Sequence, residues 1–160
     1  MIRNSKNLLI KFIFLVSIIA LVSAFFIEYV LGHQPCNLCV LERIPYLLAI
    51  IVVLLNYKFI QFEKFFILLL TIIFLAGTAL SLYHLGIEQG FIQESLVCDL
   101  KSGSNLLSKE EILKQLQEKN VSCKDVTFKI FGLSLTSYNI LISLLITIGA
   151  GKFYFNYVKN

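Results

Sequence analysis

The amino-acid sequence predicts an all-α integral membrane protein: a four-transmembrane-helix bundle with one long external loop that carries a short amphipathic helix. Two observations support this fold class. Of the 160 residues, 58 % are hydrophobic and only 15 % are charged, which is more apolar surface than a soluble domain of this size can bury. The apolar residues also gather in four long runs. We therefore expect residues 1–160 to form a single membrane domain.

Three of the apolar runs are long enough to cross a bilayer. Residues 8–31 include only Lys11 and Glu28 as charged residues, and residues 65–87 and 130–151 include no Asp, Glu, Lys or Arg. A span needs about 20 residues, or about 17 at the short limit. We expect transmembrane helices at residues 8–31, 65–87 and 133–155. The "VSA" at 22–24 resembles a signal-peptidase site, but we expect this segment to remain as the first membrane helix.

The remaining run is shorter. Its 14 uncharged residues, 44–57, reach only about 21 Å as a helix, against a hydrocarbon core of roughly 30 Å. A helix that begins at Cys39 has 19 residues and reaches about 28 Å. We therefore expect a helix over residues 39–57 that takes Glu42 and Arg43 into its first turns and is kinked at Pro45. The alternative is a helix that begins at Pro45 and crosses a thin membrane.

The basic residues predict the orientation of the bundle. With four spans, the two termini and the loop at 58–64 share one side, and that side has seven basic residues and one acidic residue. The external loops, 32–38 and 88–132, lie on the other side. The long loop contains six lysines and seven acidic residues, so it has no excess of positive charge. Cytoplasmic loops are enriched in Lys and Arg, so we expect both termini in the cytoplasm. The seven basic residues are Arg3, Lys6, Lys11, Lys58, Lys64, Lys152 and Lys159.

All four cysteines fall in the two external loops or at their edges. They are Cys36, Cys39, Cys98 and Cys123. An even number of cysteines on the outer side of a membrane, where disulfides form and persist, is typical of paired thiols.

The long external loop has too few residues to bury a core of its own. One piece of it, "KEEILKQLQEK", follows Ser108 and has Glu111 in place for a capping box, which predicts a helix. Its apolar face is narrow, consisting of Ile112, Leu113 and Leu116. This amphipathic helix fits either a position on the membrane surface or a solubilising spacer between two cysteines.

The segment "PCNLCVLERIPY" holds the most informative motif. Cys36 and Cys39 have the spacing of thiol–disulfide exchange centres, and also of half a zinc site. A zinc site calls for a second close pair, whereas 24 residues separate Cys98 from Cys123, and the two histidines of the chain add no cluster of ligands. We expect redox-active cysteines in preference to inert bridges, and no metal site.

Arg43 lies four residues after Cys39, so a helix places both on one face. A guanidinium group and a helix N-terminus both favour the thiolate, which is the reactive form of cysteine. An arginine near the bilayer is costly, and snorkelling to head groups is its ordinary role, but a neighbouring thiolate explains its position better. We expect Glu42 to point elsewhere, as a surface or interfacial acid.

His84 ends the third span on the same outer side. It can reach the depth of Arg43, and Glu88 lies one helical turn further on and could orient it. A functional histidine and an interfacial anchor are both consistent with this position. Four tyrosines near the outer ends of the spans are expected in the interfacial belt: Tyr29, Tyr46, Tyr83 and Tyr138.

A dithiol that is oxidised repeatedly needs a two-electron acceptor. The sequence has no haem, flavin or iron–sulfur signature. A lipid-soluble acceptor needs no binding domain, because it can approach Cys39 and Arg43 from within the bilayer. A membrane quinone, ubiquinone or menaquinone, fits this description.

Taken together, these motifs resemble the bacterial disulfide bond formation protein B (DsbB) family, the quinone-linked oxidases of the periplasmic oxidant DsbA. The resemblance covers nearly the whole chain: four spans, "PCNLCVLER", "YHLGIEQG", two long-loop cysteines and "FGLSLTSYN". It implies an inner-membrane protein thiol:quinone oxidoreductase that reoxidises a DsbA-like thioredoxin-fold partner and passes the electrons to quinone. It also implies that the cysteines lie on the periplasmic side.

The resemblance implies roles for the residues near the second and third spans. Cys36 and Cys39 correspond to the quinone-facing pair, with Cys39 as the thiolate that contacts the quinone. Arg43 corresponds to the polar partner of the quinone, and His84 matches a position near the quinone site.

The resemblance also assigns the long-loop cysteines. Cys98 and Cys123 correspond to a second disulfide, in which the reduced partner attacks Cys98, and a bridge between Cys36 and Cys123 then relays oxidation. Relatives often have tryptophan in the segment "CKDVTFKIFG", where this chain has Phe128. The membrane-surface contact of that segment is therefore less well supported than the thiol chemistry.

Two rival functions remain open at this stage. One is a non-enzymatic four-helix membrane protein whose disulfides staple its loops. The other is a membrane thiol reductant, which the external position of the cysteines disfavours.

Overall fold

The computed structural model describes residues 2–93, 98, 122–124, 129–130 and 132–159. The elements in order are α1 (Ile2–Tyr29), α2 (Asn37–Leu41), α3 (Ile44–Lys58), η1 (Ile60–Phe62), α4 (Glu63–Glu88), β1 (Lys129–Ile130), β2 (Leu133–Ser134) and α6 (Leu135–Lys159). In this part of the chain, four helices are long and apolar enough to cross a membrane, with α2 and α3 counted together. The predicted fold class, a four-helix membrane bundle, is confirmed. The expected helix after Ser108 and Phe128 lie outside the described residues.

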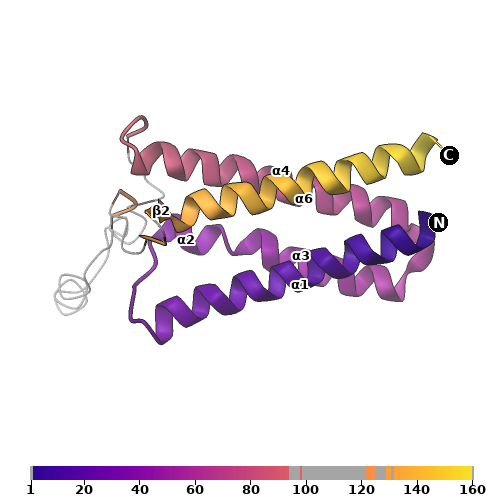
Figure 1. Ribbon diagram of the computed structural model, residues 1–160, viewed down its shortest axis with the longest axis horizontal. Coiled ribbons are helices and arrows are strands. Elements are labelled where there is room, and N and C mark those ends of the chain that lie inside the picture. Colours follow the sequence, from indigo (N-terminus) through magenta and orange to yellow (C-terminus); the bar gives the residue numbers. More distant parts are fainter. Residues whose placement is uncertain (1, 94–97, 99–121, 125–128, 131, 160) are drawn as a thin grey trace, which may run out of the picture.

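The helices form an elongated bundle with both termini at one end and α2 at the other (Figure 1). Helix α4 packs against both α3 and α6, and α1 packs mainly against α3. Large apolar side chains point outward along the helices, among them Phe65, Leu145 and Phe155, and they suit a hydrocarbon surrounding. Other apolar side chains are buried between the helices and form the core of the bundle. In this core, the ring of Tyr46 of α3 contacts the ring of Phe74 of α4 edge-on.

The expected helix over residues 39–57 is two helices in the structure. Helix α2 begins at Asn37, capped by Cys36, and ends before Glu42, while α3 begins after Arg43. Pro45 lies in the first turn of α3, where the missing N–H costs nothing, and this explains why the chain breaks at residues 42–43 instead of bending further along. Two consecutive charged residues therefore occupy a turn between helices.

Helix α4 comes close to this break. A Cβ atom on Gly77 would lie 3.1 Å from Cγ of Pro45, so a glycine lets the two helices approach at this level. Gly90 ends α4 with a φ of 78°, and the amides of Phe91 and Ile92 donate to the carbonyl of Gly86. The end of α4 near the cysteines is therefore held before His84 by the close packing at Gly77 and after His84 by the hydrogen bonds to Gly86.

A small hairpin precedes the last helix and was not predicted from the sequence. Strands β1 and β2 pair antiparallel, with Gly132 in the turn at a φ of 82°. The hydroxyl of Ser134 then accepts a hydrogen bond from the amide of Ser137, as an N-cap does, so α6 begins at Leu135.

Candidate functional site

The cysteines gather at the end of the bundle opposite the termini. Cys36 is disulfide-bonded to Cys39, and Cys98 to Cys123. Cys36 and Cys123 are buried in one apolar cluster that also contains Ile87 of α4, and Cys39 and Cys98 pack against it. The two disulfides therefore belong to one cluster, although their sequence positions are far apart.

The local structure of α2 sets the position of the first pair. Cys36 stands just before the helix in an extended conformation, and its sulfur accepts a hydrogen bond from the amide of Cys39 at 3.2 Å. The side chain of Asn37 donates to the carbonyl of Cys98 at 3.1 Å. This contact ties the long loop to the CxxC segment.

His84, which we expected at the depth of Arg43 with Glu88 to orient it, lies against the sulfur of Cys36. Its ring is almost fully buried, with Nε2 3.5 Å from Cys36 Sγ. On the other side of the ring, Nδ1 is 2.8 Å from Oε1 of Glu42. Because a carboxylate only accepts hydrogen bonds, Nδ1 carries a proton, and in the neutral ring Nε2 presents its lone pair toward the sulfur.

The expectation that Glu42 is a surface or interfacial acid was wrong. The break between α2 and α3 turns its side chain toward α4 and α6, where it is buried. Its Oε2 accepts a hydrogen bond from Nδ2 of Asn139 at 2.9 Å, while Oε1 faces His84. Donors from two other helices compensate the loss of water.

Asn139 extends this network to further helices. Its Nδ2 also donates to the hydroxyl of Ser81 at 2.8 Å, and its Oδ1 accepts from the hydroxyl of Tyr46. Tyr46 is only 5 % exposed, so its expected place in the interfacial belt was also wrong. Tyr46 lies near a span end, where tyrosine is usually interfacial, so its position in the sequence gives no sign of this burial.

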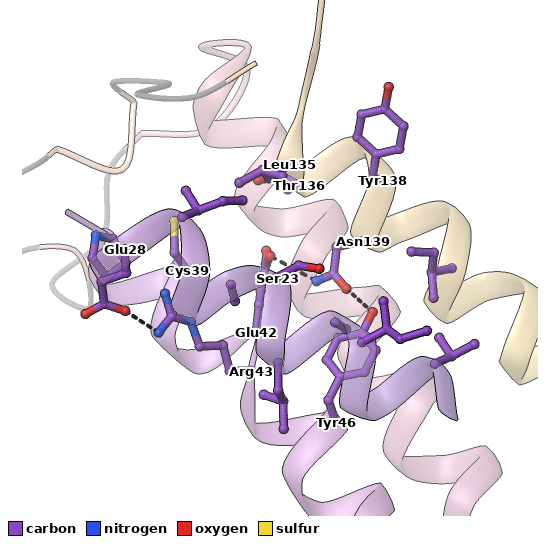
Figure 2. Close-up of a pocket in the computed structure, with 18 of the residues that line it drawn as sticks. Ser23, Glu28, Cys39, Glu42, Arg43, Tyr46, Leu135, Thr136, Tyr138 and Asn139 are labelled. Atoms are coloured by element: carbon purple, nitrogen blue, oxygen red, sulfur yellow. Dashed lines mark hydrogen bonds and ion pairs between the residues drawn. The ribbon is translucent and has the colours of Figure 1, made fainter. Parts of the chain in front are cut away.

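Arg43 points to the opposite side of the same turn, toward α1. Its guanidinium group is 2.5 Å from Oε2 of Glu28 and lies over the ring of Phe25, with Cζ 5.2 Å from the ring centroid. Figure 2 shows Arg43 directed at Glu28, with Cys39 beside them. The ion pair explains why two charged residues are tolerated close to lipid, and this partner of Arg43 was not anticipated.

Cys39 and Arg43 line one pocket of about 480 Å³ between α1, the α2–α3 turn and α6 (Figure 2). Its walls are mostly apolar. Phe12, Ile19 and Leu145 belong to the lining and are also more than half exposed, so the pocket reaches the lipid-facing surface. The lining does not include His84, which lies behind the disulfide at Cys36.

Sequence reasoning missed several polar residues at this end of the bundle. Glu28, Thr136 and Asn139 all line the pocket, and Ser81 is buried beside Asn139. A signal for them was present, since a polar side chain within a membrane span usually faces the bundle interior. The segment "LTSYN" at the start of the last span has this character.

A four-helix membrane bundle that gathers two disulfides beside a lipid-facing pocket is, as a class, a membrane-embedded thiol–disulfide protein. The family model described as "Disulfide bond formation protein DsbB" matches residues 6–152. The "Uncharacterized protein RP370" of Rickettsia prowazekii (strain Madrid E) is 37 % identical over 146 residues, covering 87 % of this chain and 83 % of the relative. No solved structure matches the chain.

The chain therefore belongs to the disulfide bond formation protein DsbB family. It is a multi-pass membrane protein of disulfide bond formation, and its family suggests an oxidoreductase.

We expect Asn139→Ala to destabilise the bundle. The substitution removes one hydrogen-bond partner each from Glu42, Ser81 and Tyr46, and each buried polar atom left unpaired costs about 1–3 kcal/mol. Thermal unfolding in detergent measures the loss. Thr147→Val is a matched control in the same helix, because among the described residues its hydroxyl bonds only to the carbonyl of Ser143 one turn away. Equal midpoints for the two variants would contradict the importance of the network.

Proposed function

We propose that this protein is an inner-membrane protein thiol:quinone oxidoreductase. In this proposal it reoxidises a DsbA-like thioredoxin-fold dithiol oxidase in the periplasm and passes the electrons to membrane quinone. One observation carries the proposal: the Cys36–Cys39 disulfide bridges two environments. Cys36 lies in the cluster that contains Cys123, and Cys39 lines the lipid-facing pocket.

The thiol side of the reaction uses disulfide exchange. A thiolate of the reduced partner attacks Cys98, breaks the Cys98–Cys123 bond and releases Cys123 as a thiolate. The second thiol of the partner then resolves the mixed disulfide, so the partner leaves oxidised. Cys123 in turn attacks Cys36 and releases Cys39 as a thiolate. Cys98 then attacks Cys123, which reforms the Cys98–Cys123 bond and leaves Cys36 and Cys39 as the reduced pair, so each exchange breaks one S–S bond and forms one. Burial of Cys36 and Cys123 in one cluster supports this relay.

The pocket fits a quinone by size and by chemistry. A volume of about 480 Å³ is in the range of small-molecule sites, and the apolar lining suits a lipid-soluble ring and tail. Cys39 and Arg43 would hold the ring end, where the guanidinium group is a hydrogen-bond donor for a carbonyl oxygen. When bound, ubiquinone or menaquinone supplies the acceptor for the two electrons and two protons that leave the Cys36–Cys39 dithiol.

Arg43 and His84 have different roles in this proposal. Arg43 is held by Glu28 and Phe25, so its positive charge stays beside Cys39 and favours the thiolate of that residue. His84 supports the other sulfur of the pair, because it contacts Cys36 and is itself fixed by Glu42. We retain His84 as a site residue, but on the Cys36 side of the disulfide.

The proposed sidedness rests on the charges of the loops. Basic residues are concentrated at the termini and in the loop at 58–64, which favours a cytoplasmic position for that end of the bundle. The cysteines lie at the opposite end (Figure 1) and would face the periplasm, where oxidised thiols persist.

The proposed activity predicts a fixed stoichiometry. Purified protein mixed with a reduced DsbA-like dithiol and ubiquinone should consume one quinone for each dithiol oxidised, because both are two-electron couples. Quinone absorbance and free-thiol titration measure the two quantities. The Cys36→Ser/Cys39→Ser variant is the inactive control. A protein that merely staples its loops would change neither quantity.

Replacement of Arg43 should weaken quinone use and spare thiol exchange. Loss of a hydrogen bond from a charged group costs about 1.5–3 kcal/mol, so Arg43→Ala should raise the apparent KM for quinone by roughly 10- to 100-fold. Exchange with the partner, followed without quinone, should stay at the wild-type rate. Lys58→Ala, at the far end of α3, is a charge-matched control. An unchanged KM for quinone would remove Arg43 from this role.

Replacement of Cys123 should trap the partner on Cys98. In Cys123→Ser, the freed thiolate of Cys98 attacks the oxidised partner. Cys123, which would release the adduct by reforming its bond with Cys98, is missing, so the adduct can be released only by the second thiol of the partner and should accumulate. An adduct of summed mass should appear on a non-reducing gel after alkylation. Cys98→Ser is the control and should give none. Folded Cys123→Ser protein without an adduct would contradict the role of Cys98.

A further inference from the structure

The surroundings of Cys36 contain groups of the types that bind metal ions, and one of them, Glu88, has no part in the thiol reaction. The two sulfurs of Cys36 and Cys39 and a ring nitrogen of His84 lie within 4.8 Å of one another. The carboxylate of Glu88, one turn after His84 on α4, is 3.8 Å from Nε2 of His84. Two thiolates, an imidazole and a carboxylate are the ligand types that zinc takes in proteins.

The spacing of these groups is close to that of a tetrahedral zinc site. With zinc–sulfur bonds of about 2.3 Å and zinc–nitrogen bonds of about 2.0–2.1 Å, a sulfur and a nitrogen ligand stand about 3.5 Å apart, and two sulfurs about 3.8 Å apart. Cys36 Sγ and His84 Nε2 are 3.5 Å apart. The disulfide holds the two sulfurs too close for zinc, so only its reduction allows the geometry.

The outer contacts of His84 also match those of a metal ligand. Metal-bound histidines usually donate their other ring N–H to a carboxylate, which fixes the tautomer and the ring orientation. His84 makes this contact with Glu42, and Glu42 is held in turn by Asn139. The lone pair of Nε2 is left to face Cys36.

Glu88 provides an independent indication of a cation. Its side chain is only 6 % exposed, and Oε1 accepts a hydrogen bond from Thr136 at 2.6 Å. Its Oε2 is buried and has no hydrogen-bond partner within the described part of the chain. A buried carboxylate oxygen without a donor, on a residue whose other oxygen is 3.8 Å from Nε2 of His84, favours a positively charged ligand beside that nitrogen.

We propose that the reduced protein binds one Zn²⁺ through Cys36, Cys39, His84 and Glu88, and that the oxidised protein does not. Binding releases the two thiol protons and forms two zinc–sulfur bonds, with no change of oxidation state. Zinc and the disulfide exclude one another, so zinc holds the pair in its reduced form. The resulting reversible inhibition of dithiol oxidation rests on the proposed function, but the metal binding does not.

Cobalt(II) tests the site directly, because a tetrahedral thiolate complex has intense visible d–d bands and a thiolate-to-metal charge-transfer band. The full-length protein, reduced and freed of quinone in detergent, should bind one Co²⁺ per chain with this spectrum, and Zn²⁺ should displace it. The oxidised protein should give no such spectrum. Zn²⁺ should also protect Cys36 and Cys39 from alkylation.

Variants separate this site from other thiols. His84→Ala and the isosteric Glu88→Gln should each abolish the tetrahedral spectrum or weaken binding by at least about tenfold, whereas His33→Ala, a change at the other histidine of the chain, should retain it. Thermal unfolding confirms that each variant is folded. Reduced wild-type protein without the spectrum, or a spectrum that survives in both Glu88→Gln and His84→Ala, would overturn the proposal. So would a spectrum lost in Cys98→Ser but not in Cys36→Ser.

The outcomes distinguish the two proposals, because metal binding is measured without partner or quinone. A protein that oxidises a dithiol but binds no cobalt would refute the metal site and leave the proposed function intact. A protein that binds cobalt as expected but oxidises no dithiol would refute the function alone.

Discussion

Glu42 brings a carboxylate into the interior of a membrane bundle, and the arrangement of the cysteine end depends on how that charge is hydrogen-bonded. A carboxylate is tolerated in such an interior only when its oxygens are hydrogen-bonded, because a buried charge without partners keeps its full desolvation cost. The two oxygens of Glu42 are met by His84 of α4 and Asn139 of α6. These contacts fix the depth and rotation of both helices relative to the α2–α3 turn.

The turn itself makes this possible. Glu42 and Arg43 are neighbours in sequence, yet Glu42 faces α4 and α6 while Arg43 faces Glu28 on α1. Pro45 in the first turn of α3 ends the helical run at this level, so the two charges occupy a turn and reach opposite sides. A single break in one span thereby connects all four helices near the disulfides.

The sequence was sufficient for the number of spans and for the cysteine motif, because both depend on local composition and spacing. It was not sufficient for the partners of His84, Glu42 and Tyr46. In α4, Thr78, Ser81 and His84 recur every three residues and are all buried, so a weak signal for the interior face was present, but it does not identify their partners on other helices. Tyr46 shows the same limit, since its burial depends on Phe74 and Asn139 from other helices. Such contacts follow from helix rotation, which tertiary packing decides.

The two sulfurs of the CxxC pair differ in their surroundings, although only two residues separate them. Cys36 precedes α2 in extended conformation and is enclosed with His84 and Cys123, whereas Cys39 lies within α2 and lines the pocket with Arg43. In the proposed reaction, a sulfur nucleophile from the long loop can therefore approach Cys36 without entering the pocket, and it releases a thiolate on Cys39, which lines the pocket with Arg43. This asymmetry sets the order of the proposed electron transfer. Electrons from the loop cysteines reach Cys36 first, whereas Cys39 is the sulfur that faces the bilayer.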